Sequence, residues 1–500
     1  MSKKLIAAAA LVAMSGSAYA AGSYFEPLSA PNTATDAASF NNNPFNLPPN
    51  FSQEFVASRT SLAADFVAKG EVYPATFGNW DMLDFGGSNA EYIFIPHEVG
   101  DGAGLTRLNR NTGEAVVLLQ GIPAHPFDTD PTDGWDHMND NFGGLDPAKM
   151  TPAGTLLTAE EWAGGGRMFE LLNPTTATGQ LDANWRWLTS IPSVSHEGVQ
   201  FDKAGNMYFV DENSSGSIYR FEPKTANDLS KGRTSVLVVN GGGVDGAVGH
   251  AQWVPITDMD SNAITTADPF DYTSRGGRAA ADEVGGTGYC RPEDLSVTTL
   301  ASGNEALYFP ATCAQIIYSV ELIDESNAVV REFVNSNVTP DVLGNNPVGT
   351  GGGNASVYGL NNPDNVAADV AGNVFIIEDQ NPGDIWMAID EDKDGVAESV
   401  ALFASLGKYG SEPTGFKNDP RDPFIWYVHV QHPSTHGNND ALWIIKHDIA
   451  DECGCQSSKN HGAYVSCVAH AAKDMGISGS IKQALMKVAA KSSCGKKVKQ

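Results

Sequence analysis

Short apolar segments recur along the middle of the chain, and each is followed by a polar pair and then by a second apolar segment. The first segments are rich in β-branched and aromatic residues and are bounded by Gly, Asn and Asp, which is typical of β-strands and turns. Six such pairs occur, at 91–95 with 105–108, 155–158 with 167–169, 206–210 with 217–220, 305–309 with 316–318, 373–377 with 385–387, and 424–428 with 442–445. This repeat predicts an all-β fold, a six-bladed β-propeller over residues 76–450. A β-sandwich with long insertions is the alternative.

The pattern changes on both sides of the repeat. Asn and Pro clusters at 41–44 and 48–49 break regular structure, so we expect residues 21–75 to wrap around the surface. Beyond residue 450, apolar positions within 464–471 and 481–488 recur at helical spacing. We expect residues 451–500 to form a small α-helical, cysteine-containing appendage.

The first twenty residues have the pattern of a secretory signal peptide. Lys3 and Lys4 precede an apolar run over residues 5–14, and Ala18 and Ala20 form an A-x-A cleavage site. The run is too short for a membrane span, which needs about twenty residues, and no other stretch approaches that length. We therefore expect a periplasmic or secreted protein without a transmembrane segment.

Six cysteines agree with an oxidising compartment. They predict three disulfides, two of them in the appendage, with the pairing left open; zinc binding by the clustered four is the alternative. The six are Cys290, Cys313, Cys453, Cys455, Cys467 and Cys494.

Composition and charge narrow the classes of function. With 41% hydrophobic and 18% charged residues, the chain is not mostly disordered. A net charge of −29 argues against nucleic-acid binding, which needs a basic face. Residues 451–500 carry eight lysines and three acidic residues, a charge of +5 that leaves −34 on residues 1–450. The appendage could therefore dock on an acidic partner, although a purely structural cap is the plainer interpretation.

Four repeat units open with a carboxylate just before the first strand: Glu197, Glu293, Asp364 and Glu412. Equivalent positions in propeller blades converge on the central axis, where several carboxylates repel one another unless they are protonated or bridged by cations. Oxygen ligands in that number favour calcium. The sequence therefore predicts an axial metal site, although solvated turn residues would show the same residue types.

Other acidic residues follow the first strand of their own units. In the pair Glu160 and Glu161, at most one side chain can face a given site, because neighbours in an extended chain point to opposite sides. Asp379 holds a similar position. His432 lies at a strand end and is a candidate ligand or proton donor.

A separate acidic segment resembles the start of a calcium loop. Asp390, Asp392 and Asp394, with a glycine next, occupy positions 1, 3 and 5 of that pattern. Glu398 at position 9 could contribute, but position 12 is Ala401, so this is no complete EF-hand. An Asp-rich hairpin turn is the alternative.

Several motifs occur in an order that resembles the PhoX family of secreted, calcium-dependent alkaline phosphatases. They are the stretch 151–161, His196-Glu197, Arg291-Pro292-Glu293 and Gln431-His432-Pro433. The resemblance implies a six-bladed propeller with an axial iron and calcium site that hydrolyses phosphomonoesters. It implies that Glu197, Glu293 and one of Glu160 and Glu161 are metal ligands, and that Arg291 holds the phosphate.

Three differences from the family pattern shift the expected metal. Asn141 stands where the family has a cysteine iron ligand, Ala153 replaces a tryptophan, and the signal peptide lacks the twin arginine used for export of folded proteins. We therefore expect calcium without the family's iron centre.

The expected function is that of a calcium-dependent phosphomonoesterase acting on a small phosphorylated substrate, with Arg291 and His432 as candidate catalytic residues. One alternative is a non-catalytic, calcium-stabilised propeller used for binding or surface assembly. Another is a gluconolactonase-like lactonase, in which Asn141 and Asn365 would suit as amide ligands.

Overall fold

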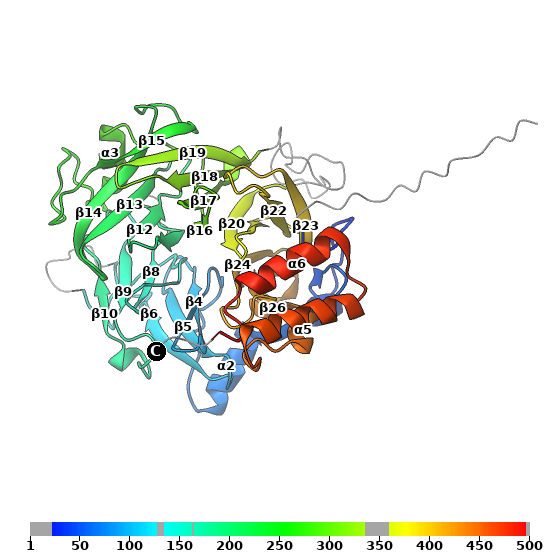
Figure 1. The fold of residues 1–500 in the computed structure, drawn as a ribbon. Coiled ribbons are helices and arrows are strands. Elements are labelled where there is room, and N and C mark those ends of the chain that lie inside the picture. The colour runs from blue at the N-terminus through cyan, green and yellow to red at the C-terminus, as the bar shows by residue number, and fades with distance from the viewer. Residues whose placement is uncertain (1–22, 128–134, 163–164, 336–359, 497–500) are drawn as a thin grey trace, which may run out of the picture.

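The computed structural model describes residues 23–127, 135–162, 165–335 and 360–496, and these form a propeller-like arrangement of antiparallel sheets around a central axis (Figure 1). The predicted signal peptide lies outside the described residues. No helix in the described part of the chain is long and apolar enough to cross a membrane.

Two four-stranded sheets come first along the chain. One contains β3 (Asp84–Gly86), β4 (Tyr92–His97), β5 (Gly104–Asn109) and β6 (Ala115–Gln120), in that order. The other contains β7 (Lys149–Met150), β8 (Leu156–Ala159), β9 (Met168–Leu171) and β10 (Trp185–Trp187).

The largest sheet has nine strands and contains two four-stranded meanders. The first meander is β11 (Val199–Phe201), β12 (Met207–Val210), β13 (Ile218–Thr225) and β14 (Asp228–Val239). The second is β16 (Ser296–Thr299), β17 (Glu305–Ala311), β18 (Ile316–Leu322) and β19 (Asn327–Val334). The strand β15 (Gly249–Pro255) pairs with both β14 and β19, and so joins the two meanders at their outer edges.

The last two sheets each take an outer strand from the N-terminal segment. β20 (Pro363–Ala368), β21 (Val374–Glu378), β22 (Asp384–Ile389) and β23 (Ser399–Leu406) are joined by β1 (Phe45–Asn46). β24 (Glu412–Asn418), β25 (Ile425–Gln431) and β26 (Ala441–His447) are joined by β2 (Phe51–Ser58). Residues 21–75 were expected to be a surface wrap, and they also contribute these two strands. β1 lies between the Asn and Pro clusters, and β2 follows the Pro cluster.

All six predicted hairpins are present as antiparallel pairs, and two of them share the nine-stranded sheet. The first strands approach one another near the axis, since β3 contacts β7, β11 contacts β16, and β20 contacts β16 and β24. Aromatic side chains fill the space between sheets; the Phe416 and Trp426 rings, for example, stack with centroids 4.4 Å apart.

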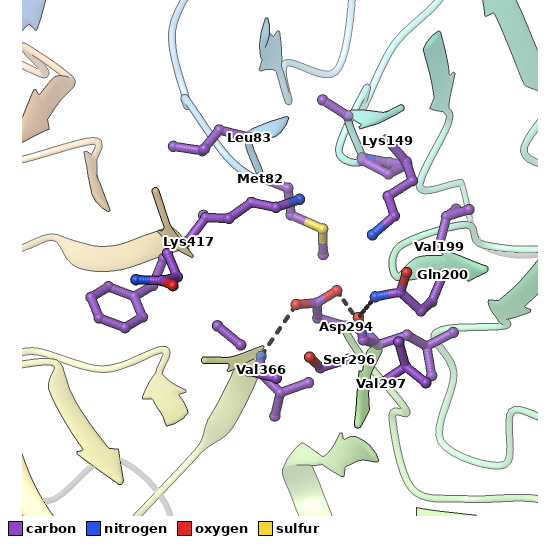
Figure 2. A pocket seen from close by; sticks show the side chains of 18 residues that line it. Met82, Leu83, Lys149, Val199, Gln200, Asp294, Ser296, Val297, Val366 and Lys417 are labelled. Atoms are coloured by element: carbon purple, nitrogen blue, oxygen red, sulfur yellow. Dashed lines mark hydrogen bonds between the residues drawn. The ribbon is translucent and has the colours of Figure 1, made fainter. Parts of the chain in front are cut away.

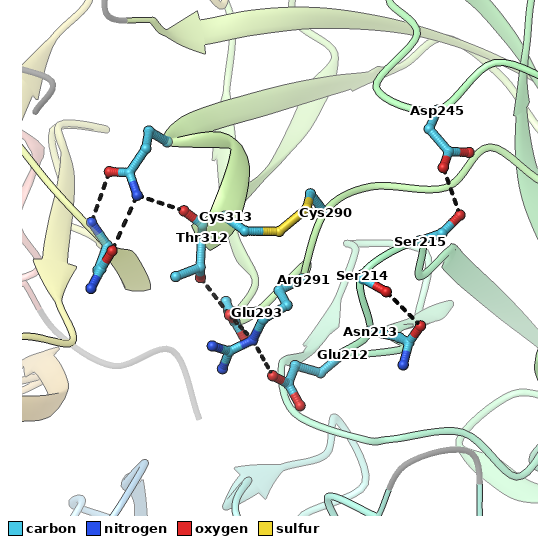
Figure 3. Close-up of a disulfide and its surroundings, with 12 residues drawn as sticks. Glu212, Asn213, Ser214, Ser215, Asp245, Cys290, Arg291, Glu293, Thr312 and Cys313 are labelled. Atoms are coloured by element: carbon cyan, nitrogen blue, oxygen red, sulfur yellow. Dashed lines mark hydrogen bonds and ion pairs between the residues drawn. A yellow bond between two sulfur atoms is a disulfide. The ribbon is translucent and has the colours of Figure 1, made fainter. Parts of the chain in front are cut away.

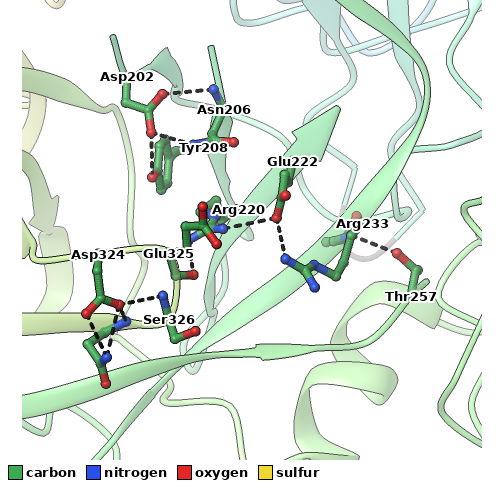
Figure 4. Close-up of polar contacts among 12 residues, drawn as sticks. Asp202, Asn206, Tyr208, Arg220, Glu222, Arg233, Thr257, Asp324, Glu325 and Ser326 are labelled. Carbon is green, nitrogen blue, oxygen red and sulfur yellow. Dashed lines mark hydrogen bonds and ion pairs between the residues drawn. The ribbon is translucent and has the colours of Figure 1, made fainter. Parts of the chain in front are cut away.

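Ion pairs on the outer strands connect neighbouring segments of the nine-stranded sheet (Figure 4). Glu222 on β13 accepts hydrogen bonds from Arg220 on the same strand and from Arg233 on β14. Arg220 also donates to the backbone oxygen of Glu325, 2.6 Å away, which links β13 to the turn before β19.

Few helices are present in the described residues. They are α1 (Ala37–Asn42), α2 (Arg59–Ala68), α3 (Gly276–Glu283), α4 (Ile449–Glu452), α5 (His461–Asp474) and α6 (Gly479–Lys491), with short 3-10 turns η1 (Gln180–Asp182), η2 (Thr312–Ala314) and η3 (Ser434–His436).

The C-terminal appendage is helical and disulfide-linked, as predicted. Disulfides join Cys453 to Cys467 and Cys455 to Cys494. The predicted apolar positions are buried in one hydrophobic cluster with residues of β25 and β26, except Ile481, which is partly buried and packs against it. Figure 1 shows α5 and α6 together beside this sheet.

Candidate metal centre

A carboxylate lies within three residues of the start of each of six first strands, β3, β7, β11, β16, β20 and β24. Four of these carboxylates were predicted, on Glu197, Glu293, Asp364 and Glu412. Two more, Asp81 and Asp146, were not. Because the first strands surround the axis, their starts bring these side chains to one place.

The closest group consists of Glu197, Glu293 and Asp364, whose carboxylate oxygens lie within 4.8 Å of one another. Burial, followed by the charge of Glu293, raises the pKa of Glu197 well above its usual value. Burial raises the pKa of Asp364 in the same way, with Glu293 as the strongest neighbouring charge. Burial also raises the pKa of Glu293 to about 7, although Arg291 acts against it. Three buried carboxylates this close together need protons or a cation.

A second set of acidic residues follows β4, β8 and β12, which are the first strands of the predicted hairpins and the second strands of their sheets. The sequence has pairs of adjacent residues there, and in two of them the first member forms a buried ion pair with an arginine outside the carboxylate cluster. Glu160 forms an ion pair with Arg167 at 2.7 Å, and Asp211 forms one with Arg278 at 2.6 Å. Of the pair Glu160 and Glu161, it is therefore Glu161 that meets the other carboxylates: burial raises its pKa, followed by the effects of Glu212 and other acidic neighbours.

Further acidic residues extend the cluster on both sides. Asp379 neighbours Glu412, whose pKa is raised first by burial and then by Asp379. On the other side, the amide nitrogen of Gln431 donates to Asp81 at 3.0 Å and to Glu98 at 2.7 Å. Burial and Asp81 raise the pKa of Glu98 to about 8. In the sequence, Glu98 follows its strand in the pair His97 and Glu98, as Glu161 does in its own pair, and either member of such a pair could have faced the site.

Some of these oxygens have no hydrogen-bond donor within the described ranges of the chain. Neither carboxylate oxygen of Asp146 receives a hydrogen bond, although the side chain is buried, and neither does Oε2 of Glu197. The groups that raise the pKa of Asp146, after burial itself, are four other carboxylates. Buried polar atoms are rarely left without partners. All the atoms that these side chains could offer to a metal are oxygens, so the residues fit hard cations such as calcium.

Arg291 is a cation at the edge of this cluster (Figure 3). Its Nε lies 2.6 Å from Oε1 of Glu212 and 3.3 Å from Oε1 of Glu293, and 44% of the side chain is exposed. These carboxylates hold the pKa of the guanidinium above its ordinary value against the opposing effect of burial. His432, on the far side, has its Nε2 3.7 Å from Oε1 of Glu412 and is also partly exposed.

The third disulfide connects two segments of the site. Cys290 precedes Arg291 and is bonded to Cys313, which follows Thr312 (Figure 3). The Thr312 hydroxyl is hydrogen-bonded to Glu293, and its backbone nitrogen donates to the backbone oxygen of Arg291 at 3.0 Å. The disulfide therefore ties the segment that carries Arg291 to one that contacts a cluster carboxylate.

A cavity of about 200 Å³ lies between the first strands of the sheets, and its lining includes the residues that directly follow Asp81, Asp146 and Glu293 in the chain (Figure 2). Lys149 and Lys417 extend into it, and Lys417 pairs with Asp84 at 2.5 Å. Burial, followed by the charge of Lys417, lowers the pKa of Lys149 to about 8. Asp294, directly after Glu293 in the chain, also lines this cavity.

Two predicted ligands lie apart from the cluster. Glu160 is engaged by Arg167, as described above. The side chain of Asn141 bonds within its own loop region: its amide nitrogen donates to Asp101, and its oxygen accepts from the backbone nitrogen of Gly102 at 3.1 Å.

The predicted calcium loop lies between β22 and β23, as a second acidic group. Oxygens of Asp390, Asp392 and Glu398 lie within 4.8 Å of one another. Asp394 is outside that group and accepts a hydrogen bond from the backbone nitrogen of Val396 at 2.8 Å. Asp390 also accepts from the backbone nitrogen of Gly395 at 3.1 Å, so a hairpin turn already uses part of its capacity.

Comparisons with solved structures give many distant likenesses. A gluconolactonase from Xanthomonas campestris is 10% identical, with 85% of this chain and 96% of that chain covered and a TM-score of 0.41. A luciferin-regenerating enzyme is 8% identical, with 74% and 92% covered and a TM-score of 0.39. A protein of unknown function from Bacteroides thetaiotaomicron is 11% identical, with 79% and 76% covered and a TM-score of 0.40. None of these likenesses is close enough to bear on function.

Among curated proteins, none matches the chain. The family model of the alkaline phosphatase PhoX, in contrast, matches residues 168–434. This stretch is more than half of the 500 residues. It contains Glu197, Arg291, Glu293 and Asp364, four members of the site described above. The chain therefore belongs to the alkaline phosphatase PhoX family.

Proposed function

We propose that the protein is a secreted, calcium-dependent phosphomonoesterase with its metal site on the propeller axis. The observation that carries this proposal is the group of buried, converging carboxylates, next to a partly exposed guanidinium; among the described residues, both oxygens of Asp146 and one of Glu197 have no hydrogen-bond donor. Glu197, Glu293 and Asp364 would be the first ligands, because their oxygens already converge. Asp146 and Glu161 would complete the set, since both are buried among other carboxylates.

Bound calcium ions would polarise the phosphoryl oxygens of the substrate and neutralise the surrounding carboxylates. Arg291 would bind the phosphate: Nε faces Glu212 and Glu293, so its two terminal nitrogens remain for two oxygens of the monoester. His432 is placed to donate a proton to the leaving alkoxide from the opposite edge of the site. The substrate class would be small phosphorylated molecules.

Calcium without iron is the metal content that we propose. All six cysteines are bonded in disulfides, so none supplies the thiolate that the family's iron centre uses. The side chain of Asn141, which stands at that position, is directed to Asp101 and Gly102.

The architecture that we propose is a six-bladed propeller over residues 76–450, with β1 and β2 of the N-terminal segment as the outer strands of its last two blades. Support comes from the nine-stranded sheet, which divides into two complete meanders at β15. Export through the signal peptide at residues 1–20 is supported by the three disulfides, which persist mainly in oxidising compartments. Docking of the appendage at 451–500 on an acidic partner stays a prediction.

The test compares p-nitrophenyl phosphate hydrolysis by Arg291→Ala and Glu293→Gln with that of the wild type. We expect kcat/KM to fall by roughly 10²–10³-fold, because such charged contacts stabilise the transition state. Arg186→Ala is the matched control: Arg186 is similarly exposed at 33% and pairs with Glu170, away from the axial carboxylates.

Wild-type turnover in both site variants would refute the assignment. A wild-type protein without phosphatase activity that calcium nevertheless stabilises would instead support the non-catalytic propeller. Hydrolysis of lactones but not of phosphate esters would support the gluconolactonase-like alternative.

A further inference from the structure

A second pocket lies where the C-terminal appendage meets the propeller. It has a volume of about 670 Å³ and is lined by Phe85 and by residues 87–90, 420–421, 455–456, 458–459 and 493–496. Residues 87–90 belong to the turn between β3 and β4, and residues 420–421 to the turn between β24 and β25. Because β3 and β24 both start at the axial carboxylates, these turns lie at the opposite ends of the strands. The pocket is therefore remote from the proposed active site.

The charge of this pocket is opposite to that of the protein. Arg421, Lys459 and Lys496 line it, and no Asp or Glu occurs among its described lining residues, although the chain carries −29. The carboxylates that act on Arg421 are already engaged: Asp419 forms two hydrogen bonds with Arg110, and Glu91 accepts from the backbone nitrogen of Asn89.

Two of the three nitrogens of the Arg421 guanidinium form hydrogen bonds that fix its position. Its Nε donates to the backbone oxygen of Asn89 at 2.6 Å, and Nη1 donates to Oδ1 of Asn111 at 2.9 Å. Nη2 is buried and has no hydrogen-bond partner among the residues that the structure describes. The backbone oxygen of Arg421 accepts from Gln456 of the appendage at 3.1 Å, so the two parts of the pocket are joined directly. A buried donor without a partner indicates a missing acceptor.

We propose that this pocket binds a polyhydroxylated anion, namely a sugar unit that carries sulfate, phosphate or carboxylate groups. The three cations supply charge-assisted hydrogen bonds to the anionic groups. Neutral side chains in the lining, among them Ser88, Gln456 and Ser493, supply partners for hydroxyls. The volume is within the range of small-ligand sites. The appendage thereby adds a binding function that is separate from the axial site and does not depend on phosphatase activity.

The test is calorimetric titration of the full mature chain with a trisulfated disaccharide, whose sulfate esters are not phosphomonoester substrates. The test variant is Lys459→Gln/Lys496→Gln. The matched control is Lys473→Gln/Lys487→Gln, which removes the same charge from exposed positions of the same appendage, outside the pocket. We expect the pocket variant to weaken binding by about tenfold or more and the control variant to change it by less than about threefold.

Further arms identify the site and the ligand chemistry. Arg291→Ala must keep wild-type binding, because this variant alters only the axial site. The desulfated disaccharide must bind more weakly than the sulfated one, and a disaccharide carrying phosphate or carboxylate groups must show the same dependence on Lys459 and Lys496. The proposal would be overturned if both lysine-pair variants lost binding equally, or if Arg291→Ala lost binding. It would also be overturned if the disaccharide did not bind, or if inorganic sulfate alone bound with the same affinity as the disaccharide.

Discussion

Removing calcium should make the stability of the protein depend on pH. In the metal-free protein, burial, with a smaller contribution from the charge of Glu212, raises the pKa of Glu293 to about 7, from an ordinary value near 4.5. A raised pKa means that the folded state binds more protons than the unfolded state between these two values. Stability is therefore fully present below the lower pKa, and it is lost as pH rises toward the higher one.

The size of the effect follows from this shift. Each pKa unit corresponds to about 1.4 kcal/mol. The ionisation of Glu293 alone would therefore lower the free energy of unfolding by about 3 kcal/mol between pH 4.5 and 7. The unfolding entropy of a 500-residue chain is on the order of 1 kcal/mol per degree, which converts this loss into a Tm decrease of about 3 °C. Glu98, with a pKa of about 8, extends the decrease to higher pH.

The assay is differential scanning calorimetry of dialysed, metal-free protein between pH 5 and 8, alongside calcium-loaded protein. We expect the Tm of the metal-free protein to fall by about 3 °C or more relative to the loaded protein, because bound calcium stabilises the ionised carboxylates. Glu293→Gln removes one titrating group and should flatten the dependence. A Tm difference between the two forms that is constant across this range would refute the reasoning.

Two other predictions separate neighbouring acidic residues. Glu160→Gln should destabilise the protein by about 3 kcal/mol, measured by thermal unfolding, because it removes the carboxylate that forms the buried ion pair with Arg167. Glu161→Gln should instead lower the calcium content, measured by elemental analysis. Calcium loss in Glu160→Gln and destabilisation in Glu161→Gln would contradict the assignment. Asp390→Asn/Asp392→Asn should lower calcium stoichiometry by one ion and leave kcat unchanged; unaltered stoichiometry would show that this segment is only a turn.

The hairpins were predictable from sequence because their strands are apolar runs bounded by turn residues. The joining of two meanders in one sheet was not, since β15 lies in the long Gly-containing stretch between two repeat units. The pairing of β2 with β26 could not be predicted either, because the two strands lie almost at opposite ends of the propeller sequence.

The candidate site was only partly predictable for a similar reason. Asp81 and Asp146 were missed although they stand about as far before β4 and β8 as Glu197 stands before β12; the strands that they directly precede, β3 and β7, are as short as β11 and give no apolar run of their own. The alternation rule left Glu160 and Glu161 open, and the partner that distinguishes them, Arg167, becomes visible only in the folded hairpin. The basic pocket beside the appendage combines turns from both ends of the chain, which no local pattern relates.

The most direct test of the proposed function is p-nitrophenyl phosphate hydrolysis by the purified mature chain at alkaline pH. The reaction is run with calcium, then with excess chelator, and then with calcium restored. We predict turnover that is lost on chelation and recovered with calcium alone, without added iron. Turnover that survives chelation, or no turnover in protein that still binds calcium and melts at a higher temperature with it, would contradict a calcium-dependent phosphomonoesterase.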